Sequence, residues 1–227
     1  MALTFRCSAR SGAETRSFEP TALVVAGWTG RDEKSLQHHI EELAAIGVPR
    51  PSSVPVFYRN AIANVLQADR IEVLGPDTSG EVEPVILAMP DGLWLTVGSD
   101  HTDRKAETMG IALSKQLCPK VLGREAWRLD EIETHFDEIR IRAFAVIGGK
   151  RVAYQDGTLA TLRAPSDLIQ RYGKGKPLAP GTVMMGGTFG AIGGIRPADR
   201  FEMELDDPRT GRVIRAAYAI ETLPVVT

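Results

Sequence analysis

Two histidines followed by two glutamates form the first group of residues that could carry out chemistry. His39 and Glu42 lie three residues apart in the segment His38-His-Ile-Glu-Glu42. Residues three apart are neighbours on a helix, so the Glu42 carboxylate can accept a hydrogen bond from the His39 imidazole and hold its tautomer. An imidazole oriented in this way can act as a general base. A solvated helix face with an ordinary His–Glu contact explains the same spacing.

Carboxylates form the second group. Glu81 and Glu83 flank Val82, and alternate side chains of a strand share a face, so both carboxylates are predicted to project to one side. Two like charges side by side are unfavourable unless a cation shares them. Asp100, in the next strand-to-loop crossing, could complete an all-oxygen site for Mg²⁺, Mn²⁺ or Ca²⁺. The alternative is a solvent-facing strand edge, which Pro84 favours.

The third group is the glycine-rich segment from Met184 to Gly194. It holds five glycines within nine positions, and glycine lets backbone amides approach a ligand closely and bind an anion. The segment lacks the Gly-x-Gly-x-x-Gly order of a dinucleotide-binding loop and the Gly-Lys-Ser/Thr ending of a P-loop. A cluster of tight turns would account for the glycines equally well.

A helix and many strands must hold these groups in place. Between Asp32 and Ile46 apolar residues recur at helical spacing, and Gly47 follows as a stop signal, which predicts a helix. Apolar runs between turn signals predict strands over much of the remaining chain. Three further elements are predicted: a helix over 105–116, a hairpin joining 139–147 to 151–155, and a helix over 166–172 with Ser166 as its N-cap. We expect one domain over residues 1–227, of the α+β class and mainly β, with an N-terminal β-hairpin over residues 1–22.

Composition excludes several classes of function. The 227 residues are 43% hydrophobic and 25% charged, as in a globular protein. Lys and Arg number 27 against 29 Asp and Glu, a balance that provides no basic surface for nucleic acid or for a membrane. No apolar run approaches the length of a transmembrane helix, and no signal-peptide pattern opens the chain. The two cysteines, Cys7 and Cys118, have neither zinc nor disulfide spacing. We therefore expect a cytoplasmic protein without nucleic-acid or membrane partners.

The order of these groups along the chain resembles the fumarylacetoacetate hydrolase superfamily. The motifs follow one another from about Leu23 to Ile220: His-x-x-Glu on a helix, Phe-x-basic at 57–59, Glu-x-Glu on a strand, Asp-x-x-x-Arg at 100–104, Gln-x-Gly at 155–157 and Gly-Thr-x-Gly at 187–190. The collinear series is the specific signal, and it is closest to a compact, DUF2848-like branch. The resemblance implies a mixed β-sandwich roll with a few short helices.

The resemblance also implies a role for each matching residue. His39 and Glu42 would be the water-activating pair, and Lys115 the active-site lysine. The implied metal ligands are Glu81, Glu83 and Asp100, and the implied substrate-binding residues are Arg59, Arg104, Gln155, Gly187 and Thr188. The chain departs from the family pattern at Gly27-Trp-Thr-Gly30, at Glu107 and at Phe189, which concerns the substrate more than the metal.

The resemblance therefore implies a divalent-metal-dependent hydrolase or lyase that acts on a small keto acid or 1,3-dicarbonyl compound. A cation such as Mg²⁺, Mn²⁺ or Ca²⁺ would stabilise an enolate while His39 activates water; the same enolate also serves decarboxylation and keto–enol isomerisation. One alternative is a non-catalytic metal- or carboxylate-binding protein that keeps the roll, and another is a purely structural β-rich protein. The expected partners are a small carboxylate or dicarbonyl substrate and a second copy of the chain in a homodimer.

Overall fold

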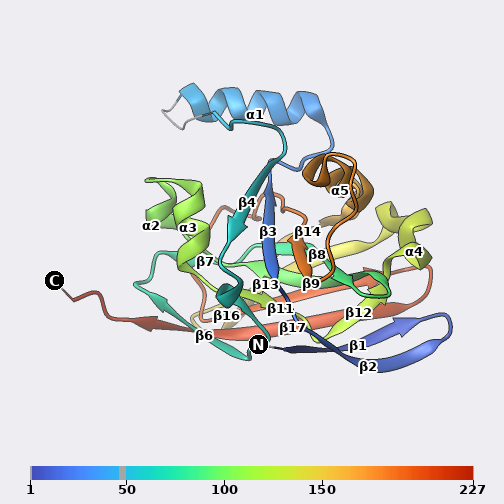
Figure 1. Cartoon of the computed structure of the whole chain (residues 1–227). Coiled ribbons are helices and arrows are strands. Elements are labelled where there is room, and N and C mark those ends of the chain that lie inside the picture. Colours follow the sequence, from blue (N-terminus) through green and yellow to red (C-terminus); the bar gives the residue numbers. More distant parts are fainter. Residues whose placement is uncertain (1, 46–49, 227) are drawn as a thin grey trace.

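The fold is built on two β-sheets, seen in the computed structural model of the chain (Figure 1). The structure describes residues 2–45 and 50–226, without the side chains of residues 39 and 42–45. The strands of the larger sheet follow the order β2 (Gly12–Phe18), β1 (Leu3–Ala9), β12 (Glu125–Arg128), β9 (Gly92–Asp100), β8 (Val82–Met89), β15 (Thr182–Met185), β3 (Ala22–Gly27) and β4 (Val56–Asn60). Off this path, β11 (Lys120–Leu122) pairs with β9 and with β5 (Val65–Leu66).

The smaller sheet packs against the larger one. Its strands follow the order β14 (Lys150–Thr158), β13 (Arg140–Ile147), β16 (Arg200–Asp207), β17 (Arg212–Leu223) and β6 (Arg70–Leu74), and β7 (Thr78–Ser79) pairs separately with β10 (Thr102–Asp103). The helices are α1 (Glu33–Ala45), α2 (Arg104–Glu107), α3 (Ile111–Leu117), α4 (Leu129–Ile132) and α5 (Pro165–Gly173), with 3₁₀ turns at η1 (Ile62–Asn64), η2 (Glu133–Glu138) and η3 (Leu159–Thr161). This mainly β arrangement confirms the predicted fold class.

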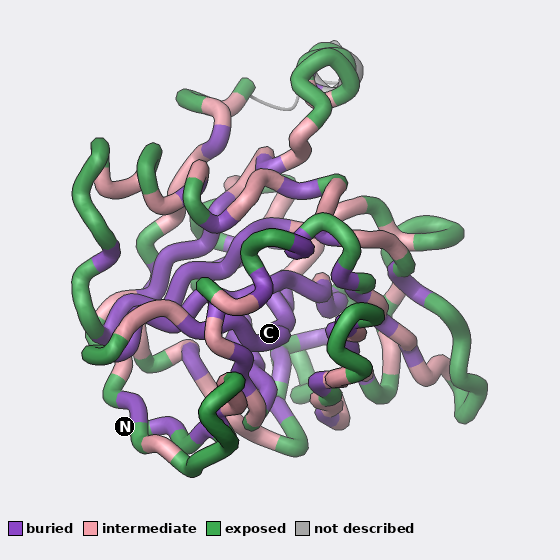
Figure 2. Tube along the Cα trace, turned by 90° about the vertical axis from the view of Figure 1, so that its right-hand side faces the viewer, coloured by how far each residue is buried: buried purple, intermediate pink, exposed green. Residues whose placement is uncertain are grey.

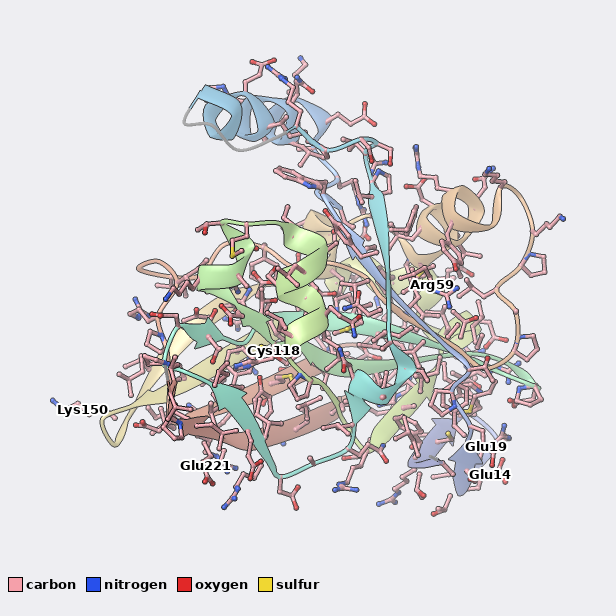
Figure 3. The ribbon with its side chains drawn as sticks, turned by 60° about the vertical axis from the view of Figure 1, so that its left-hand side comes forward. Glu14, Glu19, Arg59, Cys118, Lys150 and Glu221 are labelled. Atoms are coloured by element: carbon pink, nitrogen blue, oxygen red, sulfur yellow. The ribbon has the colours of Figure 1, made fainter. Side chains whose placement is uncertain are left out.

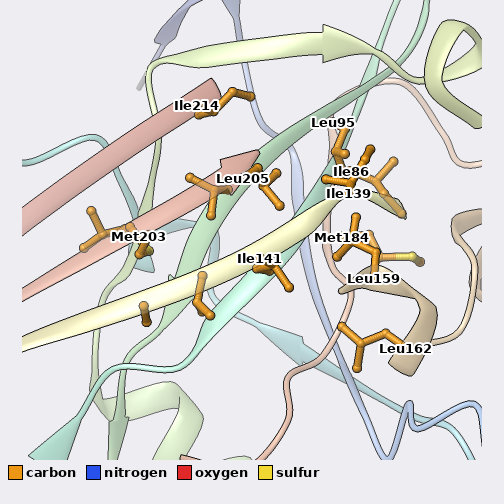
Figure 4. Packing of buried hydrophobic residues seen from close by; sticks show 14 of the residues in the cluster. Ile86, Leu95, Ile139, Ile141, Leu159, Leu162, Met184, Met203, Leu205 and Ile214 are labelled. Carbon is orange, nitrogen blue, oxygen red and sulfur yellow. The ribbon is translucent and has the colours of Figure 1, made fainter. Parts of the chain in front are cut away.

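Alternation along the central strand β8 creates a core on each side of the larger sheet. Ile86 belongs to the cluster that fills the space between the sheets, together with Ile141 and Leu205 of the smaller sheet (Figure 4). Val85 and Leu87 belong to a second cluster on the opposite face. Every residue of β8 is buried, and buried segments run through the middle of the molecule in Figure 2. Because the strand is covered on both faces, a polar side chain on it needs partners inside the protein.

Several predicted elements are confirmed and others need correction. The helix after β3 and the β13–β14 hairpin form as predicted. The single helix predicted over 105–116 is wrong, because extended backbone at Gly110 separates α2 from α3. Ser166 is not an N-cap: α5 begins at Pro165, whose lack of a backbone N–H suits the first helical position. The solvent-facing edge strand that Pro84 suggested is also wrong, since β8 lies between β9 and β15.

Helix α1 lies outermost in the molecule, above the sheets, where β3 leads into it (Figure 1). Its residues from Glu33 to Ser35 are exposed, whereas Leu36 is partly covered and Ile40 is buried. None of the described helices is long and apolar enough to cross a lipid bilayer.

Candidate active site

Three carboxylates meet where strands β8 and β9 lie side by side. Glu81 immediately precedes β8, Glu83 lies within it, and Asp100 is the last residue of β9, whose amide donates a hydrogen bond to the Glu81 carbonyl at 3.0 Å. One carboxylate oxygen from each residue lies within 4.8 Å of the other two. Glu83 is 1% exposed and Asp100 is 0% exposed. The structure therefore brings the three predicted metal ligands together.

Two lysines neutralise part of this negative charge. Lys115 on α3 forms a buried ion pair with Asp100, and its ammonium lies 3.9 Å from Glu81 Oε2. Lys120 lies directly across from Asp100 in the β9–β11 ladder, with Nζ 2.8 Å from Asp100 Oδ1 and 2.6 Å from the His101 carbonyl oxygen. Sequence reasoning missed Lys120. Its spacing before the apolar pair Val121-Leu122 resembles an ordinary strand start, and only the register of β11 reveals its partner.

Burial and charge separate the protonation behaviour of the carboxyls. Burial raises the pKa of Glu83 well above its usual range; Asp100 and Glu81 add to the rise, and Lys115 opposes it. Burial alone would also raise the pKa of Asp100, but Lys115 and Lys120 outweigh it and lower that pKa to about 2. The three carboxylates hold the pKa of Lys115 above its usual value despite the cost of burial. Asp100 is therefore ionised, whereas burial and the neighbouring carboxylates oppose the ionisation of Glu83.

Arg104 is held by the acidic residues around it. Its Nη2 lies 2.9 Å from Glu81 Oε1, its Nη1 donates to Glu107 Oε2 at 3.0 Å, and its Nε donates to the Ser79 hydroxyl at 2.7 Å. Burial would lower the pKa of the guanidinium, but Glu81 and Glu107 reverse this and raise it. Arg104 therefore orients Glu81, and the charge of its guanidinium is shared between two carboxylates.

Hydrogen bonds connect the glycine-rich segment to the metal-ligand candidates. The Gly187 amide donates to Glu83 Oε2 at 2.8 Å, and the Thr188 hydroxyl donates to the Val82 carbonyl at 2.8 Å. The Gln155 side chain accepts from the Val82 amide at 2.9 Å and donates to Thr188 Oγ1 at 2.8 Å. Gln155, Gly187 and Thr188 thus lie together at the site, where they hold β8, β14 and the loop in register.

A cavity of about 690 Å³ opens beside the carboxylates. Its lining includes Glu81, Glu83, Arg104 and Lys115, together with the hydrogen-bonded residues Gln155, Gly187 and Thr188. The volume falls in the range of small-molecule sites. The ionisable side chains therefore border a space in which a small ligand can bind.

Arg59, one of the predicted substrate-binding residues, does not join this group. Arg59 is exposed on β4 and donates to the Tyr172 hydroxyl at 3.1 Å, close to α5 (Figure 3). Alternate residues of a strand face opposite sides, and it is Tyr58, not Arg59, that lines the cavity. His39 and Glu42 are residues of α1, but their side chains lie outside the described residues, and the water-activating pair stays a prediction.

A buried polar chain lies behind Asp100. The Tyr218 hydroxyl is 2.8 Å from Ser99 Oγ and 2.9 Å from His101 Nδ1, and His101 Nε2 is 3.0 Å from Thr78 Oγ1. Burial, with Lys120 and Arg104 nearby, lowers the pKa of His101 to about 3, so its imidazole is neutral. This chain links the end of β9 to β17 of the smaller sheet and gives His101 a structural role.

Several solved structures share the fold of this chain. One is a 2-keto-3-deoxy-D-arabinonate dehydratase complexed with magnesium and 2,5-dioxopentanoate, with a TM-score of 0.63, 16% identity, and 93% of this chain and 77% of that chain covered. Another is a 5-carboxymethyl-2-hydroxymuconate delta-isomerase from Mycobacterium smegmatis, with a TM-score of 0.61, 12% identity and 100% of both chains covered. A third is a putative fumarylacetoacetate hydrolase family protein from Yersinia pestis CO92, with a TM-score of 0.61, 14% identity, and 95% of this chain and 100% of that chain covered. The fold is therefore that of the fumarylacetoacetate hydrolase superfamily, which confirms the predicted resemblance.

The family itself follows from the sequence match. Residues 26–218 match the family described as "Protein of unknown function (DUF2848)". Because this match covers most of the chain, the protein belongs to the DUF2848 family. No curated protein sequence matches the chain.

Proposed function

We propose that this protein is a divalent-metal-dependent enzyme that forms an enolate from a small 2-oxo acid or 1,3-dicarbonyl compound. The observation that supports this most directly is the cluster of Glu81, Glu83 and Asp100, because Glu81 and Glu83 also line the cavity. Buried carboxylates this close together are unfavourable without positive charge between them. A cation site that opens into a ligand-sized space accounts for both features.

The three carboxylates fit a divalent cation by their chemistry. All three offer oxygen atoms, the ligand type that Mg²⁺, Mn²⁺ and Ca²⁺ prefer. Burial raises the pKa of Glu83, and the neighbouring carboxylates of Asp100 and Glu81 add to the rise, so a bound cation would favour its ionised form. When bound there, the ion would supply Lewis-acid polarisation of two adjacent substrate oxygens and stabilise an enolate. A solved structure of the same fold carries magnesium and 2,5-dioxopentanoate, which supports this choice of ligand class.

The remaining residues of the site hold charge and geometry. Lys115 keeps Asp100 ionised and adds a fixed positive charge at the cavity wall, where an oxyanion would develop. Arg104 orients Glu81, and the Gly187 amide orients Glu83. In this proposal His39, oriented by Glu42, takes a proton from water when the reaction is a hydrolysis. Decarboxylation, isomerisation and dehydration use the enolate without an attacking water.

A non-catalytic metal- or carboxylate-binding protein is the second candidate. One observation favours it: Lys115 already pairs with Asp100 and approaches Glu81, so part of the negative charge is balanced by the protein itself. This candidate predicts binding at the same carboxylates but no turnover with any 2-oxo acid. A substrate screen that records product formation separates the two.

Calorimetric titration of Mg²⁺, Mn²⁺ and Ca²⁺ into the protein, with and without oxalate, tests the proposal. We expect binding that oxalate strengthens and that Glu83→Gln abolishes, because the amide keeps the shape of the side chain but removes its charge. Glu204→Gln is the matched control: Glu204 is also a buried glutamate, but it lies on β16 beside Arg142 and Arg215, outside the cavity. Metal bound by Glu83→Gln with unchanged affinity would refute the assignment.

A further inference from the structure

The cavity has a second part that the metal chemistry does not use. Its lining includes several apolar and aromatic side chains, among them Trp28, Leu36, Tyr58, Phe189 and Ile195, which we name the apolar subsite. The charged lining residues instead form one connected group, because Arg104 pairs with Glu81 and Glu107, and Lys115 approaches Glu81. Chelation of two substrate oxygens would occupy only the charged part. The apolar subsite is therefore available to the rest of a substrate.

The cationic side chains of the cavity already have carboxylate partners. Among the described lining residues, Arg104 and Lys115 are the only cationic side chains, and each is within ion-pair distance of two carboxylates. The Gln155 amide is also satisfied, since it donates to Thr188 Oγ1 and to the Phe189 carbonyl at 2.6 Å. A second anionic group on a substrate would lose its hydration in the apolar subsite and gain no charged partner there.

Backbone strain marks one wall of this subsite. Trp28 follows β3 with φ of +58°, in the left-handed region that a bulky residue rarely adopts. Trp28 lies close to Tyr58: burial raises the pKa of the Tyr58 hydroxyl, and hydrogen bonding with the Trp28 side chain opposes this rise. The strained backbone thus holds two aromatic side chains together at the cavity, an arrangement that suits contact with an apolar group.

We infer that the substrate is a 2-oxo acid with one carboxylate and an apolar tail, and that the tail binds in the apolar subsite. This inference rests on the proposed function, which places the 2-oxo acid group at the carboxylates. A tail of branched aliphatic or aromatic carbons gains affinity by leaving water. A tail that ends in a carboxylate does not.

Two ligands that differ only in the tail test the inference. In 5-methyl-2-oxohexanoate an isopropyl group replaces the distal carboxylate of 2-oxoglutarate, and oxalate represents the chelating part alone. We expect the wild-type protein, titrated in the presence of Mg²⁺, to bind 5-methyl-2-oxohexanoate at least about tenfold more tightly than 2-oxoglutarate, or about 1.4 kcal/mol. Phenylpyruvate, whose tail is also apolar, should likewise bind more tightly than 2-oxoglutarate.

A positive charge placed in the subsite should reduce or abolish the preference for the apolar tail. Ile195 lines the cavity and is 55% exposed, so Ile195→Lys adds a cation there without disturbing the core. We expect the ratio of the two affinities to fall by about tenfold or more in this variant. Ile192→Lys is the matched control, because Ile192 lies on the same loop, is 49% exposed and is not part of the lining; it should leave the ratio unchanged.

The outcomes separate this inference from the function on which it rests. If oxalate binds with Mg²⁺ but 2-oxoglutarate binds as tightly as the isopropyl compound, the apolar-tail inference is overturned and the metal site stands. If Ile192→Lys changes the ratio as much as Ile195→Lys, the subsite is wrongly placed. If oxalate fails to bind in the presence of Mg²⁺, Mn²⁺ or Ca²⁺, the proposed function itself is refuted.

Discussion

Lys120 provides the most demanding test of how the site is held together. Its ammonium is fully buried and has two partners, Asp100 Oδ1 at 2.8 Å and the His101 carbonyl oxygen at 2.6 Å. Lys120→Met keeps an unbranched side chain of similar length but removes the charge. The change leaves the buried Asp100 carboxylate with Lys115 as its remaining cation and leaves the carbonyl without this donor.

The expected loss of stability follows from these two contacts. Removal of one partner from a buried ion pair costs about 3–5 kcal/mol, and we take about 3 kcal/mol because Lys115 still pairs with Asp100. For a chain of 227 residues this corresponds to a decrease of about 6–12 °C in melting temperature. Urea denaturation measures the free energy of unfolding, and a thermal scan measures the melting temperature.

A second lysine separates the buried charge from lysine loss in general. Lys105 is exposed on α2, and Lys105→Met should change the free energy of unfolding by less than about 0.5 kcal/mol. If Lys120→Met costs no more stability than Lys105→Met, the ammonium of Lys120 does not stabilise the buried Asp100 carboxylate.

Two further substitutions test the surroundings of the site and the smaller sheet. Gly187→Ala should cost about 2 kcal/mol or more, since φ is +88° and the new Cβ would lie 1.9 Å from Thr29 Oγ1; Gly190→Ala, which meets no neighbour, should be tolerated in the same denaturation assay. Asp207 accepts hydrogen bonds from Thr210 and His135, which outweigh burial and lower its pKa. A lowered folded-state pKa stabilises the protein above the unfolded-state pKa of about 3.9, so Asp207→Asn should cost about 2 kcal/mol at pH 7. That cost should shrink as the pH falls below about 4, and a cost independent of pH between 7 and 3 would contradict the ionised hydrogen-bonded carboxylate.

The pairing of Glu81 and Glu83 on one face of the strand can be predicted from the local sequence, because side chains along a strand alternate with a period of two. Val82 faces the core between the sheets, so Glu81 and Glu83 must face the other side whatever the register of the neighbouring strands. The helix after β3 follows in the same way from a local period of 3.6 residues, and the β13–β14 hairpin from a two-glycine turn. Each of these depends on residues close together in the chain.

Other features of the site depend on contacts between distant segments. Lys120 reads as an ordinary surface lysine until the β9–β11 register places it opposite Asp100. The alternation of β4 is visible in the sequence, but the position of the cavity decides that Tyr58 lines it while Arg59 is exposed beside Tyr172. Such choices depend on which distant strand or helix covers a face, and that information is not contained in a local pattern.

The sequence by itself determined the mainly β class, the paired glutamates and the order of motifs that led to the family. The tertiary structure decided which charges are buried, which of them neutralise one another, and that an apolar subsite with Trp28 and Phe189 adjoins the carboxylates. The physical reason is that backbone periodicity is a local property, whereas burial and charge pairing arise only when segments such as 81–83, 100, 115–120 and 187–189 meet in the folded chain.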